Sequence, residues 1–328
     1  MEGVKLKSTL FEVKNLKTYF PVNRGFFRNV VNYVHAVDDI SLEIMSGETL
    51  GLVGESGCGK TTFGRTIIRL VPATSGEIIY KGENLIKLDD KKLRALRGEI
   101  QIVFQDPYSS LNPKRTVSQM LNEILMVRGG INRAEANERT SDLLIQVGLS
   151  PIYAARFPHE FSGGQRQRIA IARAIALNPK FVVCDEAVSA LDVSIQSQVI
   201  NLLIDIKAKS DMTYLFISHD LKVVQHISDR VAVMYLGQIV EIGPTDTIFE
   251  NPLHPYTKAL LSAALTLDKD KKKQRIILEG ETPSATIIPK GCRFNGRCWK
   301  ATEKCRCEVP KLEEVSPGHS VSCFYIEE

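Results

Sequence analysis

Apolar residues recur along the chain with two different periods, and each period predicts its own kind of element. Alternating apolar and polar positions in FEVKNLKTYF (11–20) and VHAVDDISLEI (34–44) predict two strands with one buried face each. The continuous apolar run TLGLVG (49–54) predicts a strand that is buried on both faces. Apolar residues at helical spacing follow over about 59–70, so a strand, a glycine-rich loop and a helix succeed one another.

Helical patterns replace the strands in the middle of the chain, and buried strands return afterwards. Apolar spacing predicts helices over roughly 117–127, 133–148 and 163–178. The runs KFVVCDE and MTYLFIS predict two buried strands with a helix between them, and DRVAVMYLGQIVEIG predicts a closing pair of strands. Strands that alternate with helices in this way predict an α/β sheet that carries a helical insertion.

The last part of the sequence differs in character from what precedes it. A helical pattern at about 255–265 is followed by DKDKKKQR, a charged run that is typical of a solvated linker. Five of the seven cysteines then lie between residues 292 and 323. An odd number of cysteines in a chain without an export signal favours reduced thiols. The cluster therefore predicts a metal or iron–sulfur site before it predicts disulfides.

Composition and charge exclude several classes of protein. The 328 residues carry 42 Lys and Arg against 38 Asp and Glu, a net charge of +4, which argues against a polybasic nucleic-acid-binding tail. With 44% hydrophobic and 24% charged residues, the chain is expected to be globular rather than disordered. No run approaches the ~18 apolar residues of a membrane span, and charges interrupt the N-terminal stretch where a signal peptide is apolar. We therefore expect a cytoplasmic protein.

The glycine-rich loop after the buried strand has the residues of a phosphate-binding site. It consists of Gly54, Glu55, Ser56, Gly57, Cys58, Gly59, Lys60, Thr61 and Thr62. Glycines let backbone N–H groups turn inward around phosphates, and the helix N-terminus adds a partial positive charge. Lys60 is expected to reach the terminal phosphates, and Thr61 to ligate Mg²⁺. The loop therefore predicts nucleotide binding.

Two carboxylates, Asp185 and Glu186, end the buried strand that starts at Phe181. Two acids at a strand end are also typical of the solvated start of a loop, so the pair alone is a weak signal. Burial of a carboxylate is costly unless it meets a cation or takes part in proton transfer. Beside a phosphate-binding loop, Asp185 is predicted to hold Mg²⁺ and Glu186 to position the water that attacks the γ-phosphoryl group.

A further set of motifs resembles the ATP-binding cassettes of ABC transporters. An ABC-type signature opens a predicted helix before the acidic strand, with Phe161, Ser162, Gly163, Gly164 and Gln165. Gln105 in VFQDP resembles the Q-loop, the run from Ser189 to Asp192 the D-loop, and His219 in ISHD the switch histidine. Tyr19 resembles the aromatic residue that stacks on adenine, although a tyrosine in an alternating strand is equally typical of a core.

The resemblance implies an ABC ATPase cassette, with a RecA-like P-loop core, an antiparallel β subdomain and a helical subdomain. It also implies a head-to-tail dimer, in which the phosphate loop of one chain faces the signature of the other across two ATP molecules. Glu186 is then the general base, His219 contacts the γ-phosphate, and Asp192 touches the opposite site. The Mg²⁺ ligands implied are Thr61, Gln105 and Asp185.

Finer motifs resemble peptide importers of the oligopeptide and dipeptide type. These motifs are QDPYSSLNPKRTV, DEAVSALD and NPLHPYTKALLSA. DEAVSALD has Ala187 and Val188 where most cassettes have Pro-Thr, a variant that resembles the second of the two ATPases in such systems. The resemblance implies a peripheral ATPase on the cytoplasmic face of the cell membrane. Its implied partners are a sister ATPase, two transmembrane permease subunits and, indirectly, an extracellular substrate-binding protein, with a homodimer as the arrangement in isolation.

The cysteine-rich tail resembles the four-cysteine tail of these importer ATPases. Five residues separate Cys292 from Cys298, six separate Cys298 from Cys305, and seventeen precede Cys323. In the family the cysteines hold a [4Fe–4S] cluster, which suits thiolates in a segment too short to bury a core of its own. Zinc is the alternative, because four cysteines are also a structural zinc set. Cys307 is an extra cysteine, and the spacing favours Cys305 over it as a ligand.

These expectations divide the chain into a nucleotide-binding domain at 1–250 with a helical subdomain at about 106–178, a helix and linker at 251–289, and a cysteine region at 290–328. The peptide cargo is implied by resemblance alone, and the same machinery serves nickel and short-oligosaccharide importers.

Two other functions stay open. One is a soluble ABC ATPase acting on nucleic acid or ribosomes, although the fused cassettes and basic arms usual in that class are missing from the sequence. The other is a regulator whose tail cluster gates the ATPase.

Overall fold

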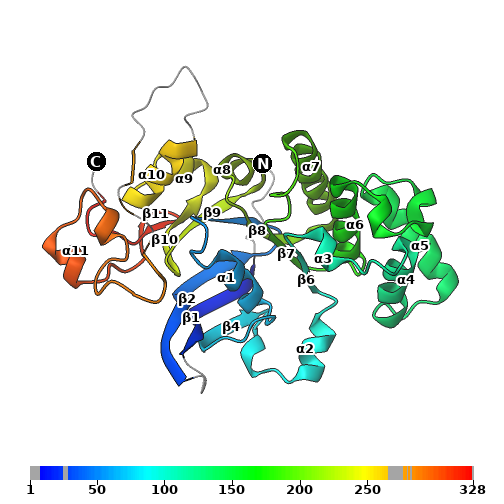
Figure 1. Ribbon diagram of the computed structural model, residues 1–328, viewed down its shortest axis with the longest axis horizontal. Coiled ribbons are helices and arrows are strands. Elements are labelled where there is room, and N and C mark those ends of the chain that lie inside the picture. The colour runs from blue at the N-terminus through cyan, green and yellow to red at the C-terminus, as the bar shows by residue number, and fades with distance from the viewer. Residues whose placement is uncertain (1–7, 25–28, 265–275, 279, 281–282, 327–328) are drawn as a thin grey trace. The chain divides into compact units, whose positions relative to one another are not determined.

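The computed structural model describes residues 8–24, 29–264, 276–278, 280 and 283–326, and these form two compact units (Figure 1). Residues 46–48 and 88–217 belong to the first unit. The described residues of 8–45, 49–87 and 218–328 belong to the second unit. The chain passes between the units more than once, so neither unit is a single continuous stretch of sequence.

An antiparallel sheet of four strands forms one part of the second unit, in the order β2-β1-β4-β5 (Figure 1). Its strands are β1 (Thr9–Arg24), β2 (Asn29–Met45), β4 (Ser75–Tyr80) and β5 (Glu83–Asn84). The alternating pattern of β1 buries Phe11, Val13 and Leu16, as a strand with one core-facing side requires. The register pairs Tyr19 of β1 with His35 of β2. The antiparallel sheet therefore matches the alternation in the sequence.

A second group of strands in this unit follows the order β11-β12-β10-β9-β3. The strands are β3 (Thr49–Val53), β9 (Arg230–Tyr235), β10 (Gln238–Pro244), β11 (Glu313–Ser316) and β12 (His319–Val321). β3 and β9 pair in parallel, and β12 adds to β10 in an antiparallel register that sets Val321 opposite Glu241. The cysteine-rich tail is therefore joined to the sheet that also contains β3.

Short helices surround these strands in the second unit. They are α1 (Lys60–Ile67), α8 (Leu221–Ile227), α9 (Thr245–Glu250), α10 (Pro255–Ala264) and α11 (Glu303–Cys307), with the 3₁₀ turns η1 (Leu85–Lys87) and η5 (Asn295–Arg297). α8 packs against β3, and α10 packs against α8. The side chain of Asp220 caps α8 by accepting hydrogen bonds from Lys222 N and Val223 N. The helix α8 therefore supports β3, the strand from which the glycine-rich loop continues.

The first unit contains three parallel strands, β6 (Ile100–Val103), β7 (Phe181–Asp185) and β8 (Thr213–Ile217), with β7 in the middle. Every residue of β7 and β8 is buried, as expected for parallel strands covered on both faces. Parallel strands place their carboxyl ends at one edge of a sheet. The residues that follow β6 and β7 are therefore held near one another.

Helices make up the rest of the first unit. They are α2 (Asp90–Leu96), α3 (Pro107–Ser110), α4 (Val117–Val127), α5 (Arg133–Gln146), α6 (Gly163–Ile175) and α7 (Val193–Ser210), with the 3₁₀ turns η2 (Pro151–Ala155) and η3 (Pro158–Glu160). α4, α5 and α6 pack on one another, and α6 also packs on β6. Capping boxes begin α4 at Thr116 and α5 at Asn132. These local signals explain why the helix starts were predictable.

The α/β organisation predicted from the sequence is confirmed, including the antiparallel strands and the helical insertion. The third predicted helix, 163–178, ends earlier than expected, because α6 stops at Ile175 and Asn178 takes up a left-handed backbone with φ of 51°. The strands β11 and β12 were not predicted. The charged run DKDKKKQR lies outside the described residues.

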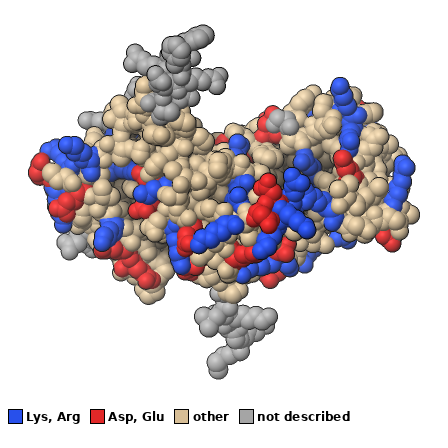
Figure 2. Space-filling model, turned by 90° about the horizontal axis from the view of Figure 1, so that it is seen from below, with Lys and Arg blue, Asp and Glu red and all other residues tan. Residues whose placement is uncertain are grey.

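None of the helices in the described ranges is long and apolar enough to cross a membrane. Figure 2 shows Lys and Arg side chains interspersed with Asp and Glu side chains over the face that it presents. This mixture fits the small net charge of +4. On this face, charge of one sign does not dominate, so the surface has no resemblance there to a polybasic nucleic-acid platform.

Candidate functional site

The phosphate-binding loop lies between β3 and α1 in the second unit, in the strand-to-helix context that the sequence predicted. Gly59 precedes α1 with φ of 109°, and no side chain caps the first turn of the helix. A Cβ atom at this position would collide with the carbonyl oxygen of Ala36. Gly59 is therefore required by both its backbone conformation and its close contact with the neighbouring strand.

Lys60 is buried inside this loop. Its Nζ donates hydrogen bonds of 2.8 Å to Gly54 O and 2.9 Å to Glu55 O, which pin the two ends of the turn together. Cys58 is buried beside it, with Sγ 3.8 Å from Lys60 Nζ, and burial raises the pKa of the Cys58 thiol. Lys60 thus organises the loop by bonding its carbonyl oxygens, with its charge held at the centre where phosphates are expected.

The remaining loop residues occupy two environments. Ser56 and Gly57 are exposed at the tip of the loop, whereas Thr61 and Thr62 are half-buried in the first turn of α1. First-turn residues of a helix present their N–H groups and short side chains at the positive end of the helix dipole. The positions of Thr61 and Thr62 therefore suit contacts with an anion and its metal ion.

Tyr19 is half-buried on β1, also in the second unit. Its hydroxyl donates a hydrogen bond to Asp38, and its ring centroid lies 4.1 Å from that of His35. Burial, followed by the bond to Asp38, raises the pKa of Tyr19. Because the hydroxyl is anchored and only part of the side chain is covered, Tyr19 has the character of an oriented surface aromatic rather than a core residue.

Asp185 and Glu186 follow one another at the carboxyl end of β7 in the first unit. Asp185 is 1% exposed, and Glu186 adopts a left-handed backbone with φ of 48°. The Ser189 N–H and hydroxyl both bond the Glu186 carbonyl, at 3.1 and 3.0 Å. A left-handed backbone at a residue with a Cβ is unfavourable, so these bonds hold Glu186 in an orientation that it would otherwise leave.

The structure brings Gln105 to Glu186. Gln105 follows β6, its amide Nε2 lies 2.7 Å from Glu186 Oε2, and the parallel register pairs Val103 with Cys184 just before the two residues. A hydrogen bond to a carboxylate is among the stronger ones in proteins. The predicted Q-loop residue and the predicted general base are therefore neighbours in this structure.

The signature residues begin α6 in the first unit. Ser162 is exposed and is the N-cap residue, and its Oγ accepts a hydrogen bond of 3.3 Å from Gln165 N. The Gln165 side chain in turn accepts from Ser162 N at 3.1 Å, which completes a capping box. Gly163 and Gly164 form the first turn, and a Cβ on Gly164 would collide with Ile195 of α7. The arrangement presents the positive end of a helix to an anion.

Asp192 and His219 lie at the starts of helices. Asp192 precedes α7 in the first unit and is exposed, with no hydrogen bond from its side chain to the helix. His219 is exposed in the short turn between β8 and α8, and belongs to the second unit. Both side chains are therefore accessible to a ligand or another chain.

Four of the five tail cysteines line one small cavity in the second unit, namely Cys292, Cys298, Cys305 and Cys323. Burial raises the pKa of Cys292 to about 11, and it also raises the pKa values of Cys298 and Cys323. Cys307 does not line this cavity and is exposed. Among the described residues, no group of three or more His, Cys, Asp or Glu is arranged to hold a metal ion.

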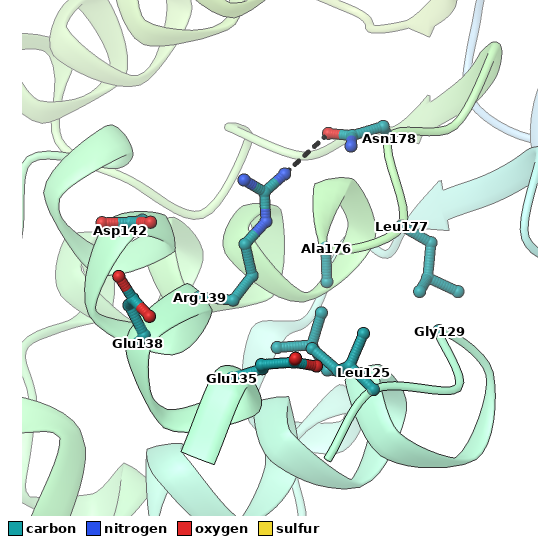
Figure 3. A pocket seen from close by; sticks show the side chains of 10 residues that line it. Leu125, Gly129, Glu135, Glu138, Arg139, Asp142, Ala176, Leu177 and Asn178 are labelled. Atoms are coloured by element: carbon teal, nitrogen blue, oxygen red, sulfur yellow. Dashed lines mark hydrogen bonds between the residues drawn. The ribbon is translucent and has the colours of Figure 1, made fainter. Parts of the chain in front are cut away.

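A larger cavity, of about 460 Å³, lies in the first unit among the helical elements (Figure 3). Acidic side chains of α5, among them Glu135 and Glu138, contribute to its lining, and Arg139 donates a hydrogen bond of 3.3 Å to Asn178 in its wall. None of the residues that the sequence assigned to ATP or Mg²⁺ is in its described lining. This cavity is therefore not assigned as the nucleotide site, despite its volume.

Two side chains that contact the predicted ATP-binding residues were missed by the sequence analysis. Arg297 of the tail pairs with Glu55 of the phosphate-binding loop, with 2.9 Å between Nη1 and Oε2. Asp38 accepts the hydrogen bond from the Tyr19 hydroxyl. Arg297 carries no motif of its own, and its only signal in the sequence is that it precedes Cys298.

Comparisons with known proteins agree with this geometry. The sequence profile of the family described as ABC transporter matches residues 37–189. A second profile, described as oligopeptide/dipeptide transporter, C-terminal region, matches residues 240–305. The dimeric structure of a post-hydrolysis state of the ATP-binding cassette MJ0796, bound to ADP and Pi, superposes with a TM-score of 0.64. It is 27% identical and covers 72% of this chain and 98% of that chain.

Relatives of known description extend over the full length. The oligopeptide transport ATP-binding protein AppF of Bacillus subtilis (strain 168) is 50% identical over 320 residues, which are 97% of this chain and 97% of that protein. The oligopeptide transport ATP-binding protein OppF of Escherichia coli (strain K12) is 48% identical over 326 residues, 98% of this chain and 97% of that protein. The chain therefore belongs to the ABC transporter family, as an ATPase subunit whose C-terminal region is of the oligopeptide/dipeptide transporter type.

Proposed function

We propose that this chain uses ATP hydrolysis to power the uptake of dipeptides or oligopeptides. The observation that carries the proposal is the 50% identity over 97% of the chain to a protein described as an oligopeptide transport ATP-binding protein. The match of residues 240–305 to the C-terminal region of such transporters supports the same conclusion. The relatives favour peptides over nickel or oligosaccharides, and transport over work on nucleic acid.

The second unit supplies the groups that bind the nucleotide. Tyr19 would stack on adenine, with its hydroxyl held by Asp38. The N–H groups of the loop would surround the β- and γ-phosphates, and Lys60 would turn from the carbonyl oxygens of the loop to the terminal phosphates. His219 would contact the γ-phosphate. In this scheme the hydrogen bonds of Lys60 keep the loop formed before ATP arrives.

Mg²⁺ would be held by Thr61, Gln105 and Asp185, and it supplies charge neutralisation at the phosphates. A threonine hydroxyl, an amide oxygen and a carboxylate are oxygen donors of the kind that Mg²⁺ prefers, which supports this set. Asp185 is 1% exposed at a strand end, and a cation offsets the free energy of burying its charge.

The first unit supplies the group that accepts a proton. Glu186 would take a proton from the water that attacks the γ-phosphoryl group, since Ser189 holds its backbone carbonyl and Gln105 holds its carboxylate. The bond from Gln105 to Glu186 Oε2 would orient this carboxylate toward the attacking water in this scheme. The product of this step is ADP with inorganic phosphate.

A second cassette would complete each ATP site. The signature residues begin a helix whose positive end suits the γ-phosphate of ATP bound to another chain. Asp192 of the D-loop is exposed at the start of α7, where a second chain can reach it. The dimer of the similar cassette MJ0796 supports this arrangement. We propose a sister ATPase as the partner, on two permease subunits at the cytoplasmic face of the membrane.

The proposal is tested by peptide uptake in vesicles that contain the two permease subunits, both ATPases and the binding protein. Labelled peptide should accumulate only with ATP, and unlabelled nickel or oligosaccharide should not compete. Lys60→Ala should abolish uptake and ATP binding together, because it removes the charge that meets the phosphates. Uptake of nickel or oligosaccharide in place of peptide would show that the cargo is not a peptide. Uptake by the Lys60→Ala variant would contradict the assignment of the ATP site.

We further propose that Cys292, Cys298, Cys305 and Cys323 hold a [4Fe–4S] cluster. All four line one cavity, which is the donor set that such a cluster takes. Four cysteines are also the donor set of a structural zinc ion, which is the alternative at this cavity. The resemblance of this tail to the four-cysteine tails of importer ATPases favours the cluster over zinc. Bound there, it would link four separate positions of the tail.

Anaerobic purification of the chain with its partner subunits, followed by iron, sulfide and zinc analysis, tests this site. About four irons and four sulfides per chain are expected. Cys305→Ser should lose the iron, whereas the matched change Cys307→Ser should keep it, because Cys307 is exposed outside the cavity. Recovery of zinc without iron in the purified protein would indicate a structural zinc site instead. Equal loss of iron in both variants would overturn the choice of Cys305.

A further inference from the structure

The cysteine-rich segment shares a buried aromatic cluster with the support of the phosphate-binding loop. The ring of Phe294 lies 5.3 Å from Tyr235 and 5.5 Å from Tyr256, and all three side chains are buried. The Tyr256 hydroxyl accepts a hydrogen bond of 2.8 Å from the backbone N–H of Glu55. A close-packed interior transmits displacements between its members. The loop and the tail are therefore mechanically connected within the second unit.

An ion pair connects the same two parts directly. Arg297 binds the Glu55 carboxylate with both terminal nitrogens, at 2.9 Å for Nη1 to Oε2 and 3.2 Å for Nη2 to Oε1. Burial opposes the charge, but hydrogen bonds to Glu55 and Tyr235 raise the pKa of Arg297. The Glu55 carbonyl also accepts a bond from Lys60. Arg297 thus fixes a residue whose backbone helps to hold Lys60 in the loop.

A second arginine of the tail reaches the predicted adenine side of the site. Arg293 is 6% exposed, and its guanidinium donates to Asp38 Oδ2 and to Leu236 O. Asp38 accepts the hydrogen bond of the Tyr19 hydroxyl through its other oxygen. Burial opposes ionisation of Asp38, but the bond from Tyr19 and the charge of Arg293 lower its pKa. Arg293 therefore orients Tyr19 through one intervening carboxylate.

One of these contacts is made to the phosphate-binding loop, and the other to the carboxylate that bonds the predicted adenine-stacking tyrosine. Arg293 follows Cys292 and Arg297 precedes Cys298 in the sequence, so both arginines come from the short segment between these two cysteines. We propose that Arg293 and Arg297 are positioning residues through which the cysteine-rich tail sets the affinity of the cassette for ATP. The proposal rests on the proposed ATP site and adds the tail to it. It assigns the tail a role beyond stabilising the fold.

The test compares variants of the full chain in its assembled transporter. Arg297→Gln should raise both the Kd and the KM for MgATP about tenfold, because a bidentate charge-assisted contact is lost, while kcat at saturating ATP stays within about twofold. Arg297→Lys keeps the charge without the two-pronged geometry and should fall between Arg297→Gln and the wild type. Arg306→Gln is the matched control, because Arg306 is an exposed tail arginine that pairs only with Glu303 among the contacts described.

Competition by magnesium tripolyphosphate separates the two arginines. Arg293→Gln should weaken ATP binding about threefold to tenfold and leave tripolyphosphate competition unchanged, since Arg293 acts on the aromatic ring that meets the base. Arg297→Gln should weaken both ligands, since Arg297 acts on the phosphate-binding loop. The opposite pattern would overturn the assignment of Arg293 to the base and of Arg297 to the phosphates.

A double-mutant cycle with Glu55→Gln tests whether Arg297 acts through the ion pair. The double variant should bind ATP no more weakly than Arg297→Gln alone, because the pair is already broken. Additive losses in the double variant would overturn the proposal. An unchanged KM in Arg297→Gln would overturn it as well, whether or not kcat falls, because a lower kcat alone indicates a smaller folded fraction of enzyme. Lys60→Ala, measured in parallel, tests the proposed ATP site separately. If it abolishes ATP binding while Arg297→Gln matches the wild type, only the role of the tail fails.

Discussion

The amide of Gln105 donates a 2.7 Å hydrogen bond to the carboxylate of Glu186 across the carboxyl ends of two paired parallel strands. The bond joins a residue expected to ligate Mg²⁺ to the residue expected to accept the proton. A movement of the loop after β6 that broke this bond would alter the orientation of the carboxylate. The same contact therefore offers a physical route by which the position of this loop affects hydrolysis.

Glu186→Gln should lower ATP turnover at least about a hundredfold, because an amide has no basic oxygen to take the proton of water. The substitution keeps the shape of the side chain, so ATP binding should be retained and the closed dimer should accumulate. Phosphate release and size-exclusion chromatography with ATP measure the two effects. Turnover near that of the wild type would contradict the role of Glu186 as general base.

Ser162→Ala should destabilise the chain by about 1 kcal/mol, because Ser162 Oγ caps α6 and its loss leaves N–H groups at the helix start without a partner. ATP turnover by the assembled dimer should fall as well, since the same exposed hydroxyl is expected to meet the γ-phosphate. Differential scanning calorimetry and steady-state kinetics measure these effects. Ser141→Ala is the matched control, because that hydroxyl only bonds a carbonyl within α5, at 3.2 Å. Equal losses in both variants would contradict the special role of Ser162.

The sequence predicted those parts of the site that depend on neighbouring residues. The phosphate-binding loop, the signature at the start of α6 and the acids after β7 are each encoded within a few positions, and helix caps and strand ends place them. The bond between Gln105 and Glu186 was not predicted, because it depends on which strands lie side by side.

What the sequence could not predict depends on residues far apart in the chain. Arg297 and Glu55 are 242 positions apart, and nothing in either segment indicates the other. The strand β11 is exposed throughout and has no apolar alternation, so its pairing with β12 left no periodic signal. In both cases a long-range contact, rather than local propensity, determines the structure.

Gly59→Ala should be more harmful than Gly57→Ala, although both residues have a positive φ, 109° and 79°. A Cβ at Gly59 would collide with Ala36 O, whereas at Gly57 it would meet nothing within 4 Å. We expect a loss of more than about 3 kcal/mol for Gly59→Ala and about 1–2 kcal/mol for Gly57→Ala. Urea denaturation of the two purified variants measures the difference. Similar losses would mean that backbone conformation alone, and not the close contact, requires glycine at Gly59.

The buried thiols should be inert in the folded protein at neutral pH. Burial raises the pKa of Cys58 above its usual value and the pKa of Cys184 to about 12. Since the thiolate is the nucleophile, iodoacetamide at pH 7.5 should label the exposed Cys307 and spare both buried residues until the chain unfolds. Peptide mapping by mass spectrometry gives the order of labelling. Rapid labelling of Cys58 in the native protein would show that the loop opens without nucleotide.

The raised pKa of Cys184 also predicts how stability changes with pH. Above about pH 9 the unfolded chain releases the Cys184 proton while the folded chain keeps it, so the free energy of unfolding should fall as the pH rises. The slope is about 1.4 kcal/mol per pH unit for one such group, and it acts until the pH reaches the folded pKa of about 12. Cys184→Ala removes the group, so the free energy of unfolding should depend less on pH between pH 9 and about 10.5. The small cavity that the substitution leaves lowers stability at every pH. If the wild type and Cys184→Ala lose stability in parallel over this range, Cys184 ionises as readily in the folded chain as in the unfolded one, and its burial has no electrostatic consequence.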